Sequence, residues 1–203
     1  MDKTIVFLDD GFLSKLSRHL GRGDYIRFDR IKFSEVISEK ERLECKHIFY
    51  YNAPPFQSDK PTSEEEKRKK GYDKFISKLI KNNKITIREG RCQRLKIDGK
   101  FIYKQKAVDS LAIIDLMNIP LRHKDIKNII IVSSDSDFVP AIENLKEFGV
   151  KTILYTYYEK KRDTNFSRSN ELVKSVGKYV LLKKEDFERS KITKYLKEVD
   201  KNA

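Results

Sequence analysis

Four aspartates stand where an α/β protein would place the residues of a reactive site. Asp9 directly follows a short apolar run, and Asp135 and Asp137 follow a second one. Parallel strands end at a common edge of their sheet, and ligands bind in the crevice at that edge. Asp109 opens a predicted helix, and its position close to the preceding loop would bring it to the same edge. We therefore expect these four aspartates to form one acidic cluster.

Carboxylates that lie close together raise each other's pKa unless a cation neutralises them. Sites built from carboxylate oxygens suit Mg²⁺ or Mn²⁺. One or two such ions can activate a water and stabilise the leaving oxygen when a phosphodiester bond is cleaved. Ser133, Ser134 and Ser136 lie beside the aspartates and are candidates for hydrogen bonds to the metal ligands or for phosphate contact. The cluster thus predicts one or two divalent ions as cofactor.

Simpler roles explain parts of the same pattern. Asp135 or Ser136 could cap the following helix, whose Pro140 falls in the first turn, but capping explains one acidic residue and not two. Asp10 is interpreted as a turn residue, and Asp115 is expected on another side of its helix. The three histidines have no metal-ligand spacing, and we find no GxSxG motif, Walker-type loop or dinucleotide fingerprint.

The charge balance indicates the class of partner. The 203 residues include 44 Lys and Arg against 31 Asp and Glu, which gives a formal net charge of +13. This excess favours polyanions, with nucleic acid first and an anionic membrane surface second. Nearly half of it lies between Lys84 and Lys106, where eight basic residues against Glu89 and Asp98 give a net of +6.

The basic segment has the pattern of a β-hairpin, with Asp98-Gly99 as its turn. A basic ribbon that also carries aromatic rings could follow a phosphate backbone and stack bases. An alternative of about equal weight is a hairpin with a solvated charged face, which commonly prevents edge-to-edge pairing of strands. The candidates for RNA contact are Arg91, Arg94, Tyr103, Lys104 and Lys106.

Six short runs rich in β-branched and aromatic residues predict strands. They are Thr4–Leu8, His47–Tyr51, Ile85–Arg88, Asn128–Ser133, Lys151–Tyr155 and Lys178–Leu182. Helical periodicity follows Val108 and again follows Asp137, with Gly149 placed to end the second helix. This alternation predicts an α/β fold with a mostly parallel central sheet that is covered on both faces.

The length suits one domain with one core. We expect this domain to span residues 1–183 and a C-terminal helical tail to span 184–203. Within the tail, an amphipathic helix over 185–201 would use Phe187, Ile192 and Leu196. Residues 57–73 carry balanced charges and are interpreted as a surface loop that leads into a solvated helix.

Three further features concern the environment of the chain. The apolar runs are too short to span a bilayer, and no signal-peptide pattern precedes the first strand. Cys45 and Cys92 have neither disulfide nor zinc spacing, so we expect both thiols to be reduced. These features predict a cytoplasmic protein with no membrane partner. The oligomeric state is left open, and a homodimer is compatible with the sequence.

Four segments in order resemble the NYN domain family, a branch of the PIN-like nucleases. They read VFLDDG from Val6, FYYNAPP from Phe49, QKAVD from Gln105 and VSSDSDFVP from Val132. The resemblance spans about residues 4–182 and implies a three-layer α/β/α sandwich with metal-dependent ribonuclease activity. It matches the acidic positions of the family's site to Asp9, Asp109, Asp135 and Asp137.

The chain departs from the family pattern at three positions. Phe12 stands at the position of the usual Asn and removes a polar group that could orient the metal ligands. Ala107 replaces the usual Gly, which we expect to be harmless, and Asn52 replaces the usual Asp.

The sequence thus predicts a metal-dependent endoribonuclease that uses Mg²⁺ or Mn²⁺ to cleave single-stranded or structured RNA. A second hypothesis is an RNA-binding PIN-like module with weakened catalysis, which would use the basic hairpin. A minor alternative is a haloacid-dehalogenase-like phosphatase, because Asp135–Val139 is similar to the nucleophile motif of those enzymes. That alternative leaves Asp9 and Asp109 without a role.

Overall fold

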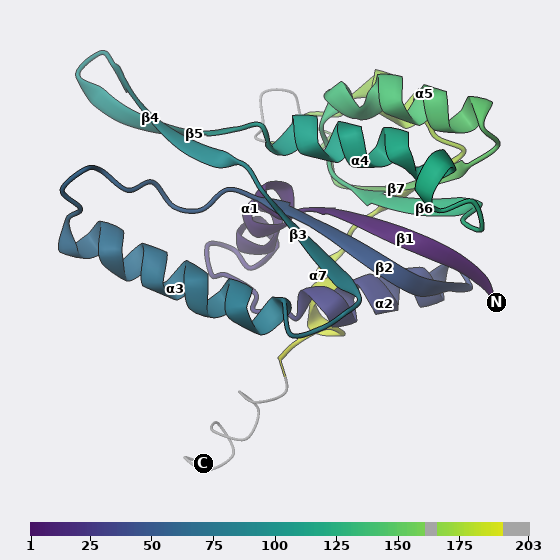
Figure 1. The fold of residues 1–203 in the computed structure, drawn as a ribbon, viewed down its shortest axis with the longest axis horizontal. Coiled ribbons are helices and arrows are strands. Elements are labelled where there is room, and N and C mark those ends of the chain that lie inside the picture. The colour runs from purple at the N-terminus through teal and green to yellow at the C-terminus, as the bar shows by residue number, and fades with distance from the viewer. Residues whose placement is uncertain (161–165, 193–203) are drawn as a thin grey trace, which may run out of the picture.

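A six-stranded sheet forms the middle layer of the computed structural model, which describes residues 1–160 and 166–192 (Figure 1). The strand order is β3-β2-β1-β6-β7-β8, and neighbouring strands run parallel. The strands are β1 (Asp2–Asp9), β2 (Leu43–Asn52), β3 (Ile85–Glu89), β6 (Asn128–Val132), β7 (Lys151–Thr156) and β8 (Lys178–Leu181). All six predicted strands are confirmed.

The two central strands are apolar along their length because helices cover both faces of the sheet. The side chains of residues 5–8 in β1 and 129–132 in β6 are at most 2% exposed. Successive side chains on a strand point to opposite faces. Val6 and Leu8 therefore belong to one core, and Ile5 and Phe7 belong to the other.

Two helical layers complete the predicted α/β/α sandwich (Figure 1). One face of the sheet carries α4 (Val108–Arg122), α5 (Val139–Glu147) and α6 (Asn170–Ser175). The other face carries α1 (Asp10–Leu20), α2 (Arg30–Lys40), α3 (Ser63–Leu79) and α7 (Lys184–Glu188). A 3-10 turn, η1 (Ser136–Phe138), leads into α5.

The helix ends follow from local chemistry. Asp9 caps α1, since its carboxylate accepts a hydrogen bond from the Phe12 N–H. Thr62 and Glu65 form a reciprocal capping box at the start of α3. The loop before α3 and the mostly exposed helix agree with the prediction for 57–73, although Glu65 itself is buried. Gly149, with φ 72°, follows the end of α5 as expected.

The predicted hairpin is present and projects from the body of the molecule as a two-stranded arm (Figure 1). It consists of the antiparallel strands β4 (Arg91–Ile97) and β5 (Lys100–Lys106). Asp98 and Gly99 at its turn have φ values of 50° and 79°, and positive φ at both turn residues matches the right-handed twist of the strands. Gly90 at the base allows a close approach, because a Cβ there would lie 2.4 Å from the Lys106 carbonyl oxygen.

The predicted C-terminal helix over 185–201 is wrong in extent. Helix α7 ends at Glu188, because the backbone of the following residues bonds elsewhere: the Asp29 N–H donates to the Ser190 carbonyl, and Lys191 forms a bridge with Phe28. Residues 193–201 of the prediction lie outside the described residues. Phe187 is fully buried, with its ring centroid 4.9 Å from that of Phe28.

Two predictions about the environment can be compared with the structure. Cys45 and Cys92 are free thiols on strands β2 and β4, as expected. Among the helices of the described residues, none combines the length and apolar character that a membrane span requires.

Candidate functional site

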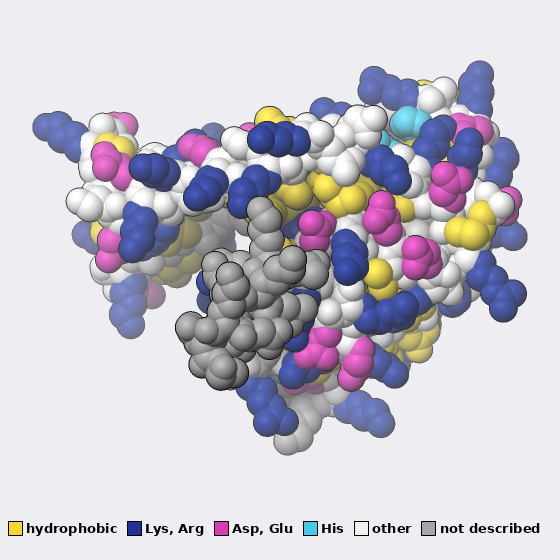
Figure 2. Space-filling view, turned by 90° about the horizontal axis from the view of Figure 1, so that it is seen from below, with side chains coloured by type: hydrophobic (Ala, Val, Ile, Leu, Met, Phe, Trp, Pro, Cys, Tyr) yellow, Lys and Arg dark blue, Asp and Glu magenta, His cyan; other side chains and the backbone are white. Residues whose placement is uncertain are grey.

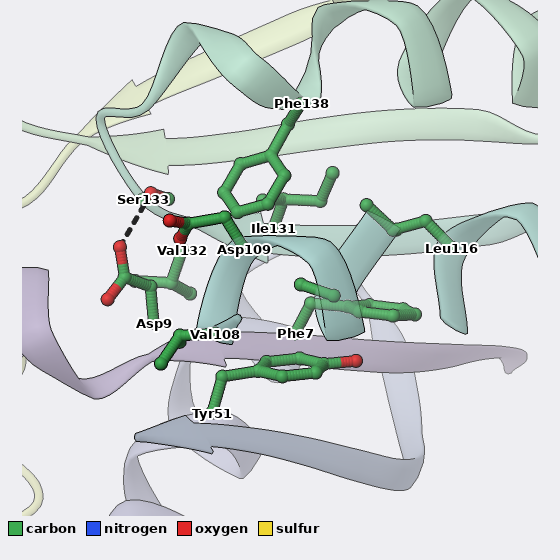
Figure 3. Close-up of a pocket in the computed structure, with 11 residues that line it drawn as sticks. Phe7, Asp9, Tyr51, Val108, Asp109, Leu116, Ile131, Val132, Ser133 and Phe138 are labelled. Carbon is green, nitrogen blue, oxygen red and sulfur yellow. Dashed lines mark hydrogen bonds between the residues drawn. The ribbon is translucent and has the colours of Figure 1, made fainter. Parts of the chain in front are cut away.

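The strand order reverses between β1 and β6, and open α/β sheets bind ligands at such a switch point. Leu8 pairs with Val132 near the ends of these strands. The next residues, Asp9 and Ser133, therefore come side by side at the carboxyl edge of the sheet. The Ser133 hydroxyl donates a hydrogen bond of 2.8 Å to Asp9 Oδ2 (Figure 3).

Burial is the main influence on Asp9 and raises the pKa of its carboxyl to about 6. Hydrogen bonds from the Phe12 N–H and the Ser133 hydroxyl favour the charged form and oppose this rise. The negative charges of Asp109 and Asp10 increase the pKa further. Near neutral pH, Asp9 thus carries a charge in surroundings that a nearby cation would make more favourable.

The low polarity around Asp9 has a clear structural origin. A small space of about 10 Å³ beneath the carboxylates is lined almost entirely by apolar side chains from both sides of the switch point. Figure 3 shows Phe7 and Tyr51 below this space and Phe138 above it. The lining also includes Val108, Ala112, Leu116, Ile131 and Val132.

Asp109 lies in the first turn of α4, and its carboxylate points toward Asp9 and Ser133 (Figure 3). Partial burial raises its pKa, and the negative charges of Asp135 and Asp137 raise it further. The charge of Asp109 also raises the pKa of Asp9. All four predicted aspartates therefore interact electrostatically at one edge of the sheet. Asp109 is the member of the cluster that interacts with each of the others.

The turn that positions Asp109 is strained. Ala107 precedes α4 with φ 66°, in the left-handed region where a Cβ costs about 1–2 kcal/mol. Glycine would adopt this conformation without that cost, so Ala107 makes the turn less stable, and its harmlessness to the site stays a prediction. The turn connects Lys106, the last residue of β5, to the helix that carries Asp109.

Asp135 and Asp137 follow β6 on the way into α5. The Asp135 carboxylate accepts a hydrogen bond from the Asp137 N–H at 2.9 Å, so the predicted capping role of Asp135 is confirmed for the 3-10 turn. The Asp137 side chain is exposed. The side chains of Ser134 and Ser136 form no hydrogen bond with other described residues, so Ser133 alone of the three serines contacts the acidic cluster.

The donor set at the switch point suits a hard divalent cation. Mg²⁺ commonly binds one or two carboxylates, keeps several waters and takes up substrate phosphate oxygens. Asp9 and Asp109 supply two carboxylates whose pKa values are raised by burial first and by neighbouring negative charges second, and a cation would oppose both effects. Within the described parts of the chain, no three His, Cys, Asp or Glu side chains form a ready-made metal site. A cation held by the two carboxylates of Asp9 and Asp109 would keep several waters in its coordination shell.

The departure at Phe12 has a structural explanation. The Phe12 side chain is 7% exposed and belongs to the core on the α1 side of the sheet. Its ring makes an edge contact with Phe166, with centroids 6.5 Å apart. Only the Phe12 backbone N–H contacts the site, through its hydrogen bond to Asp9.

A buried ion pair lies beside the site, and no sequence pattern indicated it. Asp10 is the first residue of α1 and is 4% exposed, so its interpretation as a turn residue is wrong. Its Oδ1 accepts hydrogen bonds from Arg30 Nε at 2.9 Å and Nη2 at 2.7 Å. Its Oδ2 accepts hydrogen bonds from Ser14 and from Asn52, the residue that replaces the family's usual Asp. Burial opposes the charge on Arg30, but Asp10 raises the pKa of the guanidinium.

Asp115 also lies away from the acidic cluster, as expected. It is 5% exposed, and it accepts hydrogen bonds from Tyr51 at 3.0 Å and from Arg88 at 2.6 Å and 2.8 Å. Through these hydrogen bonds, Asp115 joins α4 to β2 and β3 below the site. Arg88, one of the basic residues counted toward the charged segment, is therefore used in packing rather than in the arm.

The five predicted RNA contacts are divided between the two faces of the arm. Arg94 pairs with Tyr103 across the ladder and shares its face, whereas Arg91, Lys104 and Lys106 lie on the opposite face. The Arg94 guanidinium lies 4.6 Å from the ring centroids of both Phe56 and Phe101 and 3.8 Å from the Glu65 carboxylate. Arg94 and Tyr103, whose ring contacts Phe56, thus tie the arm to the loop before α3.

Comparison with models of protein families identifies the NYN domain over residues 13–182. The matched range contains Asp109, Asp135 and Asp137 and begins shortly after Asp9. No curated protein matches the chain. The family match covers most of the sequence and agrees with the six-stranded parallel sheet flanked by helices. This chain belongs to the NYN domain family, within the PIN-like nuclease superfamily.

Proposed function

We propose that this protein is a metal-dependent endoribonuclease whose reaction takes place at the switch point of the sheet. One observation carries the proposal: Asp9 and Asp109 converge there on an apolar floor, with pKa values raised by burial and by neighbouring carboxylates. Membership of the NYN family supports a nuclease that acts on RNA. The net charge of +13 supports a polyanionic substrate.

Asp9 and Asp109 would hold an Mg²⁺ or Mn²⁺ ion, and Asp135 and Asp137 would contribute to its outer ligands or to a second ion. A bound ion of this kind supplies a nucleophilic water at neutral pH and stabilises the leaving oxygen. Ser133 fixes the orientation of Asp9 through its 2.8 Å hydrogen bond. The exposed Ser136 hydroxyl is available for a phosphate oxygen.

The RNA would approach along basic surfaces near this edge. Arg91, Lys104 and Lys106 are exposed on one face of the arm, and Lys106 is three residues from Asp109. Figure 2 shows Lys and Arg side chains over much of the face seen from below, interspersed with acidic ones. Phosphate contacts of this type add affinity without sequence preference and weaken as salt increases.

The reaction is tested with end-labelled single-stranded RNA in Mg²⁺, Mn²⁺ or EDTA. Asp109→Asn should reduce metal-dependent cleavage by about 100-fold or more, because it removes a charged ligand from the site. Asp125→Asn is the matched control, since Asp125 is exposed and pairs only with Lys46 on the surface among the described residues. If Asp109→Asn and the control cleave RNA equally well, the site assignment is wrong.

One observation favours the RNA-binding module as a second candidate. Phe12 is turned into the core, so the site lacks the polar side chain that NYN domains usually have at this position. Tight binding of RNA without cleavage in either metal would support this candidate over the nuclease.

The role of the arm is tested separately by reversing two charges. Lys104→Glu combined with Lys106→Glu should weaken RNA binding and reduce its dependence on salt, because two phosphate contacts are lost. Lys146→Glu combined with Lys151→Glu makes the same charge change at the opposite edge of the sheet and serves as control. Equal loss of affinity in both double variants would indicate a nonspecific charge effect and contradict the assignment to the arm.

A further inference from the structure

A second and larger pocket opens on the other side of Asp9, between α1, α2, α3 and the end of β2. Its volume of about 600 Å³ is within the range of pockets that bind small organic molecules. Its lining is rich in aromatic rings, of which those of Tyr25, Tyr72 and Phe75 are partly exposed. Phe28 and Tyr50 complete the aromatic lining and are buried.

The floor of this pocket is held in one arrangement by buried polar groups. The side chains of Arg30 and Asp10 are 7% and 6% exposed and form the ion pair described above. The Arg30 guanidinium also lies 4.2 Å from the Phe28 ring centroid and 5.1 Å from that of Phe75. Arg30 Nη2 donates to the Tyr25 hydroxyl at 2.6 Å, which leaves the hydroxyl proton of Tyr25 available to an acceptor on a ligand.

The charge around the pocket favours an anion. Arg27, Arg30 and Lys78 contribute positive charge to its lining, and Asp10 is the only acidic side chain among the described residues that line it. Lys78 is exposed near the end of α3. A ligand that complements the aromatic and positively charged lining combines a flat aromatic ring with a negatively charged group. A nucleotide has both.

The pocket adjoins the proposed reaction site along the edge of the sheet. Asp10, in its lining, follows Asp9 directly, so their Cα atoms are about 3.8 Å apart. Asn52, also in the lining, ends β2 next to the Tyr51 that pairs with Asp9. A strand of RNA with a phosphate at Asp9 would therefore bring a neighbouring nucleotide to the mouth of the pocket.

We propose that this pocket binds one nucleobase of the RNA strand, which stacks on the aromatic wall of Tyr72 and Phe75 while Lys78 contacts the adjacent phosphate. The inference rests on the proposed function, since it takes the strand at Asp9 to be RNA. It adds a position at which the protein selects bases. The Tyr25 hydroxyl at the floor of the pocket can donate a hydrogen bond, so it favours bases with an acceptor atom at that position.

The test measures binding in EDTA, where the proposed cleavage does not occur, so its outcome is independent of catalysis. The probes are the four nucleoside 5′-monophosphates and a short single-stranded RNA, and dissociation constants are obtained by calorimetry. Tyr72→Ala should weaken the binding of both kinds of probe by about tenfold. A loss of this size is typical when a ring on which a base stacks is removed. Tyr72→Phe keeps the ring and loses only the hydroxyl that donates to Glu89 at 2.6 Å, so it should bind nearly as tightly as the wild type.

A charge variant and its control complete the experiment. Lys78→Ala should weaken binding several-fold and reduce its dependence on salt. Lys74→Ala removes another exposed lysine of the same helix that does not line the pocket, and it should have no effect. Thermal unfolding of each variant establishes that the fold is intact.

Three results would overturn the proposal. The first is absence of nucleotide binding at millimolar concentration, and the second is binding that Tyr72→Ala leaves unchanged. The third is weaker binding of the monophosphates by Tyr72→Ala without any change for the RNA, which would identify a site for free nucleotides instead of one for the strand. If nucleotide and RNA binding follow the expected pattern but RNA is not cleaved in metal, the proposed reaction fails while the base pocket is supported.

Discussion

Asp9→Asn should stabilise the metal-free protein near neutral pH, although it removes a residue of the proposed site. The pKa of Asp9 rises from its ordinary 3.8 to about 6 on folding, chiefly through burial. One pKa unit corresponds to about 1.4 kcal/mol, so the charged form is disfavoured by about 3 kcal/mol in the folded state. Asp9 is partly exposed and solvent screens part of this penalty, so we expect about half of it to be recovered.

Asparagine has nearly the same shape as aspartate and can retain both hydrogen bonds. Its amide oxygen can accept from the Phe12 N–H, and its amide group can donate to the Ser133 hydroxyl oxygen. The substitution therefore removes the charge with little change in packing. The stabilisation corresponds to a rise of about 3–6 °C in melting temperature for a chain of this size.

The stabilisation by Asp9→Asn should depend on pH. The raised folded pKa means that the protonated form of Asp9 stabilises the fold. This contribution is present below about pH 4 and is lost as the pH rises through about 6. The advantage of Asp9→Asn over the wild type should therefore be absent near pH 4 and complete above about pH 7. Thermal unfolding of both proteins in EDTA across this range measures the difference.

Metal should reverse the order of the two proteins. If the proposed function is right, Mg²⁺ or Mn²⁺ should bind the folded wild type and raise its melting temperature by mass action, whereas the variant lacks one of the charged ligands and should gain less. Asp73→Asn removes an exposed carboxylate from α3 and serves as a control that should show neither effect. Destabilisation by Asp9→Asn in EDTA, or a difference that does not vary with pH, would refute the reasoning about burial of charge at the switch point.

Three further substitutions test packing around the site. Asp10→Asn leaves the buried Arg30 guanidinium without its counter-charge and should lower the free energy of unfolding by about 3 kcal/mol in urea denaturation; a loss well under 1 kcal/mol would contradict the buried pair. Ala107→Gly relieves a positive φ and should raise the same free energy by about 1 kcal/mol, whereas destabilisation would count against the strained turn. Phe187→Ala opens a cavity beside Phe28 and should lower it by about 3–5 kcal/mol. No loss for Phe187→Ala would mean that residues 184–203 form a separable tail.

The strands and the arm could be predicted because their signals are local. A run such as residues 129–132 is apolar on both faces, and only a sheet covered on both sides accommodates it. The Asp98-Gly99 turn likewise specifies its own conformation. The position of Asp9 and Ser133 at one edge followed from the rule that parallel strands share their carboxyl ends.

The parts that the sequence did not predict depend on contacts between distant residues. Asp10 is a buried ion-pair partner only because Arg30, twenty residues later, reaches it from the next helix. Helix α7 stops because its following residues pair with the backbone near Phe28, a competitor that helical periodicity cannot indicate. The aromatic pocket combines residues of several elements and has no continuous motif.

The two-stranded arm has a mechanical consequence for the site at its base. Its strands have seven residues each, which corresponds to a length of about 23 Å. The contacts of Arg94 and Tyr103 with Phe56 hold the arm about midway along β4, so three residues of that strand, about 10 Å, extend beyond this support. A rotation of about 10° at Arg94 would displace the tip by about 2 Å, whereas the base of the arm and the nearby Asp109 would stay in place.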